Sequence, residues 1–327
     1  MVAGIFTPLL THLKLNRKFQ QRIATVNPTI AQSLPIISLT VVGFVLKKVH
    51  IIHAGDGPVM TRFILNVTLP SVIFLSVSRA SIGPIRLIFL ASLGILVPLV
   101  LRFISDRIIS PLNLRPEVAG VIIVGAMVMN VGAFLFPIVQ TVFGSEGVSR
   151  LAAFDLGNSL VASSYGYYLA TFFGNKTPSG VQNSLMRALK VPILWASILG
   201  IIVNLSGLAL PTYLLKLLEP VSSANTPLAM IALGTFLEFK FPKWKLMGLA
   251  VFLRIAVGFG IGQLLIFLFR LHGAEKVAVG LGSAMPIGMV TLVYAVSEGL
   301  DSEFAAAIIS LSIVVGMIVT PLMLLMY

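Results

Sequence analysis

The chain is dominated by apolar runs about 20 residues long, which are separated by short polar connections. A run of this length, folded as an α-helix, spans the hydrocarbon core of a bilayer. Membrane strands would instead alternate polar and apolar residues in shorter segments. The sequence therefore predicts an all-α integral membrane protein with ten transmembrane helices, at residues 29–49, 58–78, 84–104, 116–142, 150–173, 191–211, 222–239, 245–270, 275–297 and 302–326.

The composition agrees with a membrane protein. Hydrophobic residues make up 57% of the 327 positions and charged residues 10%, whereas soluble domains carry about 25% charged residues. The net charge of +12 would suggest nucleic acid as the partner of a soluble protein. Here it is explained by loops at an anionic membrane surface. We therefore expect membrane lipid, and no nucleic acid, as a partner. The absence of cysteine excludes disulfides, Cys-ligated zinc and thiol catalysis.

One offset relates the two halves of the chain. Three pairs of residues are separated by 157 positions: Pro35 and Pro192, Gly43 and Gly200, and Pro70 and Pro227. Each pair falls at the same place in corresponding apolar runs, and internal repeats are typical of secondary transporters. Five runs lie in each half, and an odd number inverts the second copy relative to the membrane. The sequence predicts two inverted five-helix repeats, 29–173 and 191–327.

Two polar segments lie outside the repeats. Residues 1–28 combine apolar residues at helical spacing with a basic end, which predicts a segment lying in the membrane interface. The connection at 174–190 falls on the side with more lysine and arginine in its short loops, and this side is expected to be cytoplasmic. Both termini are then non-cytoplasmic, and the basic residues of 1–28 depart from that rule.

The fourth run of each half contains a proline. Pro137 and Pro286 cannot donate to the carbonyls of Ala133 and Gly282, so each run is expected to carry a free acceptor and a break at membrane depth. A simple proline kink is the alternative at either position. Small or polar residues near the breaks are the candidate substrate-binding residues: Asn130, Gly132, Pro137, Ser283, Pro286 and Thr291.

Asp155 is a carboxylate inside an apolar run, three residues before Asn158 on the same helical face. Charged groups at membrane depth are costly and usually functional, so we interpret Asp155 and Asn158 as a coupling pair for a proton or sodium ion. The alternative is an interfacial carboxylate paired with Arg150. Glu298 is expected to be solvated. Arg62, Arg102 and Arg254 are expected to extend toward the interface, and an anion-steering role for one of them is the alternative.

Several segments resemble the auxin efflux carrier family, within the superfamily of bile-acid, arsenite and riboflavin transporters. They are Asn130–Pro137 with Phe143 and Gly144, similar to the fourth span; Ser283–Ala295, similar to the ninth; and Phe154–Asn158 and Pro227–Gly234, similar to bacterial members. The similarity covers nearly the whole chain from about residue 30. It implies a scaffold of helices 1, 2, 6 and 7 and a transport domain of helices 3–5 and 8–10. In that fold the broken helices 4 and 9 cross beside the substrate.

The resemblance also implies a function: an efflux-type secondary transporter of small organic anions in the bacterial inner membrane. Plant auxin exporters carry a second proline where this chain has Thr291, so a mono- or dicarboxylate is expected in place of auxin. Two alternatives are a sodium-coupled symporter of the bile-acid type and a channel or membrane sensor. An enzyme is not expected, nor are a cofactor or a metal, because no His, Cys or paired carboxylates converge at membrane depth. The oligomeric state is left between a monomer and a homodimer.

Overall fold

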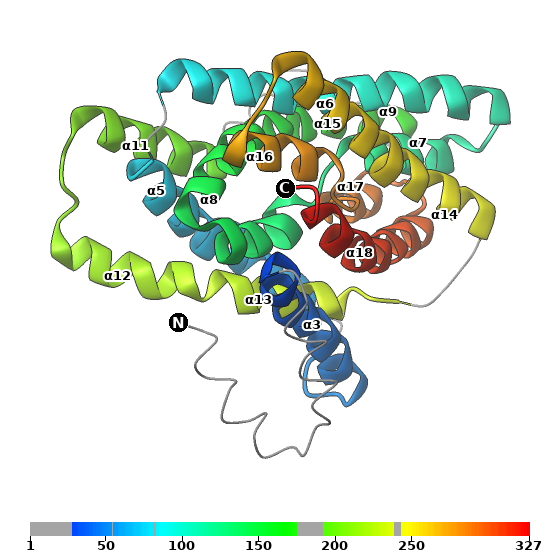
Figure 1. Ribbon diagram of the computed structural model, residues 1–327. Coiled ribbons are helices and arrows are strands. Elements are labelled where there is room, and N and C mark those ends of the chain that lie inside the picture. Colours follow the sequence, from blue (N-terminus) through cyan, green and yellow to red (C-terminus); the bar gives the residue numbers. More distant parts are fainter. Residues whose placement is uncertain (1–27, 54, 81–82, 175–191, 239–242) are drawn as a thin grey trace, which may run out of the picture.

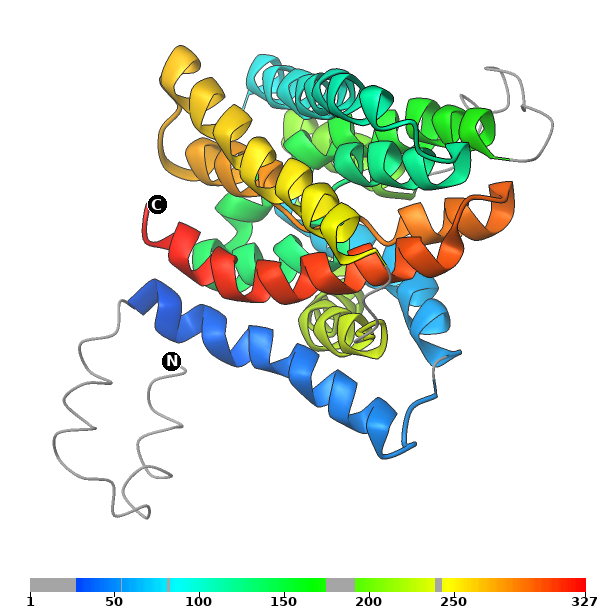
Figure 2. The same ribbon diagram turned by 90° about the vertical axis from the view of Figure 1, so that its right-hand side faces the viewer.

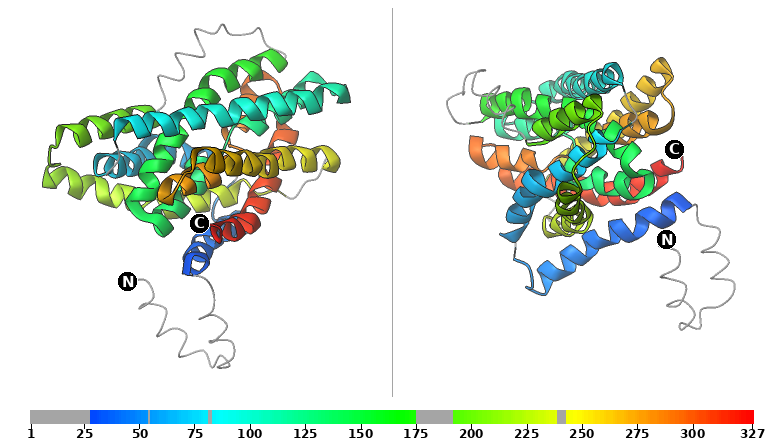
Figure 3. Two further views of the ribbon diagram at one scale, coloured as in Figure 1. Left: turned by 45° about the horizontal axis from the view of Figure 1, so that its top comes forward. Right: turned by 90° about the vertical axis from the view of Figure 1, so that its left-hand side faces the viewer.

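A computed structural model describes residues 28–53, 55–80, 83–174, 192–238 and 243–327 (Figure 1). The further views in Figure 3 show helices packed against one another. Within the described residues the one extended pairing is an isolated antiparallel bridge between Met129 and Ile287. The predicted all-α class is therefore confirmed. Apart from their end residues Pro28 and Gly174, the predicted segments 1–28 and 174–190 lie outside the described residues.

The first half contains the helices α3 (Pro28–Lys48), α4 (Asp56–Phe63), η1 (Ile64–Thr68), α5 (Leu69–Ser78), α6 (Pro84–Ile109), η2 (Ser110–Leu112), α7 (Pro116–Met127), η3 (Val131–Leu135), α8 (Phe136–Val161), η4 (Ala162–Gly166) and α9 (Tyr167–Phe173). The second half contains α11 (Pro192–Ser206), α12 (Thr212–Ser223), α13 (Asn225–Thr235), α14 (Trp244–Val251), η5 (Phe252–Val257), α15 (Gly258–Phe269), α16 (Gly273–Ser283), α17 (Val290–Glu298) and α18 (Ser302–Leu324). The η2 helix is a 3₁₀ turn, and the other η elements are π-helical turns inside longer helices.

Six helical stretches of the described chain are long and apolar enough to cross a membrane: Ala31–Lys48, Asp56–Ser78, Ile85–Leu112, Val131–Phe173, Trp244–Phe269 and Ser302–Leu324. The other predicted runs are shorter or divided. In the predicted run at 191–211, the helix α11 ends at Ser206. The predicted run at 222–239 contains the end of α12, which begins at Thr212, and the whole of α13. The runs at 116–142 and 275–297 are each split in two. These helices indicate an integral membrane protein.

Glycines allow several helices to meet backbone to backbone. A Cβ atom on Gly43 of α3 would lie 2.1 Å from the carbonyl oxygen of Ile231 on α13, and one on Gly94 of α6 would lie 1.9 Å from that of Phe154 on α8. Small residues allow this close approach between membrane helices. Figure 1 shows α11 with α5 on the left and α3 with α13 at the bottom. Figure 2 shows α18 running beside α3.

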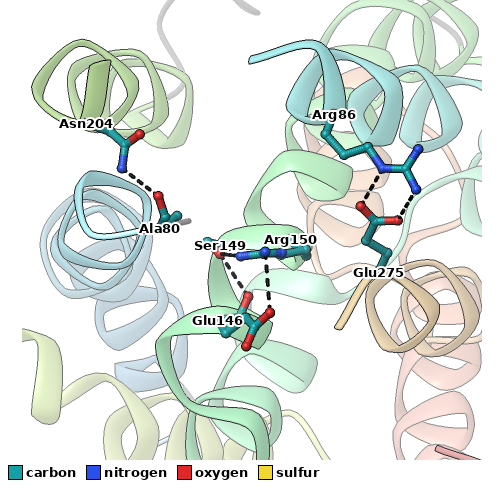
Figure 4. Close-up of polar contacts among 7 residues, drawn as sticks. All are labelled: Ala80, Arg86, Glu146, Ser149, Arg150, Asn204 and Glu275. Carbon is teal, nitrogen blue, oxygen red and sulfur yellow. Dashed lines mark hydrogen bonds and ion pairs between the residues drawn. The ribbon is translucent and has the colours of Figure 1, made fainter. Parts of the chain in front are cut away.

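Hydrogen bonds of the first half recur in the second with the offset of 157. Lys47 and Asn204 occupy equivalent positions, and each donates to two carbonyls at the end of a neighbouring helix. Figure 4 shows the bond from Asn204 to Ala80. The bonds run from Lys47 Nζ to the carbonyls of Thr235 (2.6 Å) and Leu237 (2.8 Å), and from Asn204 Nδ2 to those of Ser78 (3.1 Å) and Ala80 (2.7 Å). The acceptors are also related by 157 positions, so both halves use the same contact.

The ends of equivalent helices share an unusual backbone conformation. His50 and Gly207 follow α3 and α11 with φ angles of 60° and 66°, and they are 157 residues apart. Asn113 and Arg270 follow η2 and α15 with φ angles of 45° and 49°, and they are also 157 residues apart. The repeated offset therefore describes local geometry as well as residue type.

Candidate functional site

The first of the two predicted breaks lies before the proline. Helix α7 ends at Met127, and the chain is non-helical until η3 begins at Val131. Pro137 instead lies in the first turn of α8, so the prediction of a break at Pro137 is wrong. The π-turn η3 explains this difference, because the N–H of Phe136 bonds to the carbonyl of Val131, five residues back. The wider turn accommodates the proline ring without ending the helix.

The second break lies at Pro286, as the sequence predicted. Helix α16 ends at Ser283 and α17 begins at Val290, so Pro286 lies between them. This non-helical stretch packs on α18, since a Cβ atom on Gly316 would lie 2.4 Å from Pro286 Cγ. A residue larger than glycine at position 316 would displace the broken segment.

The two breaks cross and are hydrogen-bonded to each other. The N–H of Asn130 donates to the carbonyl of Pro286 (2.9 Å), and the N–H of Gly288 donates to that of Val128 (2.8 Å). Met129 and Ile287 form the antiparallel bridge between these bonds. We call residues 128–130 and 284–289 the crossover. Backbone groups released by the broken helices thus bond to each other, as non-helical backbone at membrane depth requires.

Three of the predicted site residues carry buried polar atoms that have no hydrogen-bond partner. These atoms are Asn130 Nδ2, Ser283 Oγ and Thr291 Oγ1. Asn130 is 4% exposed, and Ser283 and Thr291 are fully buried. An unpaired buried polar group costs about 1–3 kcal/mol, so such atoms indicate a ligand or water site. Asn130 lies in the crossover itself and Thr291 in the first turn of α17.

The remaining predicted site residues face other elements. The hydroxyl of Ser283 points toward α15, because a Cβ atom on Gly262 would lie 3.2 Å from Ser283 Oγ. Gly132 faces the η1–α5 segment, where a Cβ atom would lie 3.2 Å from Leu69 Cδ2 and 3.5 Å from Leu65 Cδ2. The structure therefore brings Asn130 and Pro286 together, and it sets Gly132 and Ser283 on the flanks.

Arg254 lies beside the crossover, although the sequence favoured an interfacial position for it and offered anion steering only as the alternative. It is fully buried in η5. Its Nε donates to the carbonyl of Met285 (2.8 Å), Nη1 to that of Ala126 (2.9 Å) and Nη2 to that of Ser283. Ala126 lies in the last turn of α7 and Ser283 ends α16. One guanidinium thus caps the C-terminal ends of both broken helices.

The prediction that Arg254 extends toward the interface is therefore wrong. Free carbonyls at two helix ends satisfy the guanidinium inside the protein, so the side chain does not need the interface. A signal was present in the sequence, because the residue lies near the middle of the apolar run at 245–270. What the sequence does not contain is the position of the acceptors, which come from distant segments.

Asp155 lies in α8 and is 2% exposed. Asn158 Nδ2 donates to Asp155 Oδ1 (2.7 Å), so the predicted pair is in contact. Arg150 forms an ion pair with Glu146 (3.4 Å) (Figure 4), and Asp155 has no ion pair within the part of the chain that the structure describes. The alternative of an interfacial carboxylate paired with Arg150 is therefore excluded.

Other charged residues do not form a metal site. Glu298, which the sequence predicted to be solvated, is 7% exposed and accepts a hydrogen bond from Ser297 Oγ (2.8 Å). That prediction is wrong, because α17 turns its C-terminal end against the protein. Among the described residues, no three His, Asp or Glu side chains are grouped closely enough to hold a metal ion.

Comparison with known proteins gives the family. A family model described as membrane transport protein matches residues 28–324. A relative named uncharacterized transporter, from Methanothermobacter thermautotrophicus, is 29% identical over 303 residues, which cover 88% of this chain and 95% of the relative. An uncharacterized transporter of Methanocaldococcus jannaschii is 28% identical over 301 residues, with 88% and 96% covered. This chain therefore belongs to the membrane transport protein family, that of the auxin efflux carriers.

Proposed function

We propose that the protein is a secondary transporter of small organic anions, such as mono- or dicarboxylates. Its substrate binds at the crossover, which is opened alternately to the two sides of the membrane. The observation that carries this proposal is the amide of Asn130, a buried hydrogen-bond donor at the crossover with no partner among the described residues. A carboxylate oxygen is the natural acceptor for such a donor.

The helix ends at the crossover favour a negative charge. The helical segment η3–α8 begins at Val131, directly after residues 128–130 of the crossover. Helix α17 begins at Val290, directly after residues 284–289. The first N–H groups of a helix lack intrahelical partners and carry the positive end of the helix dipole. Two such ends next to the donor of Asn130 form a site suited to an anion.

We further propose that ten transmembrane helices form two inverted repeats. The contacts repeated at the offset of 157 support this arrangement. Helices α3–α5 and α11–α13 would form the scaffold, and the other helices the transport domain. Within that domain, Arg86 of α6 holds Glu275 of α16 by two hydrogen bonds of 2.7 and 2.9 Å (Figure 4). Gly132 would lie where the domain slides past Leu65 and Leu69 of the scaffold.

Topology can be tested with single cysteines, because the natural chain has none. We propose the bacterial inner membrane as the location, with both termini non-cytoplasmic. Asn113 and Arg270 are exposed equivalents, and inversion places them on opposite sides. In intact cells, an impermeant thiol reagent should label Arg270→Cys and not Asn113→Cys. Equal labelling of both would contradict the inverted repeat, and the reverse pattern would contradict the orientation.

We propose that Asp155 couples transport to a proton. A buried carboxylate without an ion pair can be neutralised by protonation, and Asn158 can bond to either form. Sodium would prefer free carbonyl ligands at the breaks. The carbonyls of Ala126, Ser283 and Met285 are already bonded to Arg254, which argues against a cation at that position.

The transport proposal is tested with purified protein. A thermal-shift screen of malonate, malate and indole-3-acetate, at two pH values and with or without sodium, should show stabilisation by at least one acid that does not depend on sodium. Saturable counterflow of that acid in proteoliposomes would distinguish a carrier from a channel. Lack of binding by every acid in the panel, or linear flux without counterflow, would contradict the proposal.

A further inference from the structure

The crossover is a place where four helix ends meet, and their charges oppose one another. The C-terminal ends of α7 and α16 each carry a partial negative charge of about one half, and the N-terminal ends of η3 and α17 carry similar partial positive charges. Without another group these charges would offset each other. A crossover built from backbone alone would then have little preference for an anion.

Arg254 changes this balance because it offsets only the partial negative charges of the C-terminal helix ends. All three of its hydrogen bonds go to backbone carbonyls. Those of Ala126 and Ser283 lie at the C-terminal ends of α7 and α16, and that of Met285 lies two residues beyond the end of α16. One full positive charge offsets about two negative half-charges. The positive ends at Val131 and Val290 are left without compensation, and they flank the free amide of Asn130.

The guanidinium of Arg254 is not neutralised by any acidic side chain of the described residues. Among the described residues, Arg254 has no ion pair, and the buried carboxylate Asp155 is bonded to Asn158. The arginine comes from η5, where the π-turn interrupts the regular helix between α14 and α15. Gly258 lies one turn further on and gives the guanidinium room, since a Cβ atom there would lie 3.0 Å from Arg254 Nη2.

We propose that Arg254 sets the charge preference of the crossover. It is a positioning residue, because its hydrogen bonds go to backbone carbonyls and it would act on the substrate through the helix ends. By holding the negative ends of α7 and α16, it leaves the positive ends of η3 and α17 to act on a carboxylate. This inference rests on the proposed anion site and assigns the origin of its selectivity.

The test compares each acid with its uncharged amide. Malonate and malonamide, malate and malamide, and indole-3-acetate and indole-3-acetamide differ in charge and little in size. Binding is measured on purified protein for the wild type, Arg254→Gln, Arg254→Lys and the control Arg102→Gln. Arg102 lies in α6 and forms an ion pair with Asp106 (3.0 Å), so Arg102→Gln also removes one arginine charge but leaves the three carbonyls that Arg254 holds unchanged.

The wild type should bind at least one acid about tenfold or more tightly than its amide. Arg254→Gln should bind the acid and the amide about equally, whereas Arg254→Lys and Arg102→Gln should retain the preference. A loss of packing alone would weaken acid and amide by the same factor. Melting temperature and gel filtration identify variants that do not fold.

Each outcome supports or overturns a stated claim. An unchanged ratio in folded Arg254→Gln overturns the role of Arg254 and leaves the anion site standing. A lost preference in folded Arg254→Lys, which keeps the charge, overturns the role of the charge. A wild type that binds no acid better than its amide overturns the anion site itself.

Discussion

Thr68 and Asn225 are hydrogen-bonded to each other, from Thr68 Oγ1 to Asn225 Oδ1 (2.9 Å), and they are 157 residues apart. Each is therefore in contact with its own counterpart in the other half. Such a contact occurs only beside the axis that relates two copies. Met129 and Ile287 are paired in the same way at the crossover, with one residue of drift. These two contacts support one axis running through the scaffold and the crossover.

Replacing Asn130 should weaken substrate binding. Asn130→Ala removes the free amide donor, and a hydrogen bond to a charged partner contributes about 1.5–3 kcal/mol. We expect affinity for the acid to fall about tenfold or more. Binding to purified protein is the measurement, with Asn66→Ala as the control, because Asn66 is exposed and bonds only within its own helix. Unchanged affinity in Asn130→Ala would remove Asn130 from the site.

Replacing Asp155 should remove the pH dependence of transport. Asn cannot bind a proton, but its side-chain oxygen can still accept the hydrogen bond from Asn158. We expect uptake by Asp155→Asn in proteoliposomes to be flat between pH 5 and pH 8, while the wild type varies. Asp106→Asn, which changes a half-exposed carboxylate on α6, should keep the wild-type profile. A wild-type profile in Asp155→Asn would make Asp155 a structural residue.

Adding a methyl group at Gly94 should destabilise the protein. Its Cβ atom would lie 1.9 Å from the backbone oxygen of Phe154, so α6 and α8 must separate. Overpacking of this kind costs typically about 1–3 kcal/mol or more. A Cβ atom on Gly248 in α14 would have no atom within 4 Å. Gly248→Ala should therefore stabilise its helix by about 0.5–1 kcal/mol. Thermal melts should therefore shift in opposite directions, and similar shifts would contradict the tight contact.

The repeated caps of Lys47 and Asn204 should contribute separately to stability. Lys47→Met and Asn204→Leu each leave two helix-end carbonyls without a donor, which costs about 1–3 kcal/mol per site. The two sites share no partner, so the double variant should show the sum within about 0.5 kcal/mol. Lys48→Met, next to Lys47 and exposed, is the control. Strong coupling between the two sites would show that they are not independent.

Low pH should destabilise the folded protein, because it protonates Asp301 in the loop before α18. Burial raises the pKa of this carboxyl, but hydrogen bonds from Lys243 Nζ (2.9 Å) and Phe304 N (3.0 Å), with the charges of Lys243 and Arg115, lower it below the usual value for aspartate. A lowered pKa in the folded state stabilises the protein above about pH 4, the unfolded value, and the effect is lost as the pH falls further. The melting temperature of Asp301→Asn should depend less on pH between 5 and 3 than that of the wild type. Parallel curves would contradict this.

The sequence predicts helices better than it predicts where they break. Runs of apolar residues define membrane helices because lipid requires them, and Asp155 is recognisable by its depth within such a run. Pro286 marks its break, but Pro137 does not. It lies in the first turn of α8, directly after the π-turn in which the N–H of Phe136 bonds to the carbonyl of Val131. Arg254 was misassigned for a similar reason. Its partners at Ala126 and Ser283 belong to other segments, and only the tertiary structure shows that their carbonyls are free.

The equivalent caps of Lys47 and Asn204 use the same bonds with different donors, an ammonium and an amide. Two identical halves, facing opposite ways in a membrane, would have to use one residue for this cap at both surfaces. A lysine is favoured at the cytoplasmic surface of the membrane and disfavoured at the opposite surface. Once the halves are joined in one polypeptide, each copy can diverge, and here one cap is charged and the other is an amide. In the proposed inverted arrangement, the two halves can therefore keep the same bond while the lysine favours one side of the membrane only.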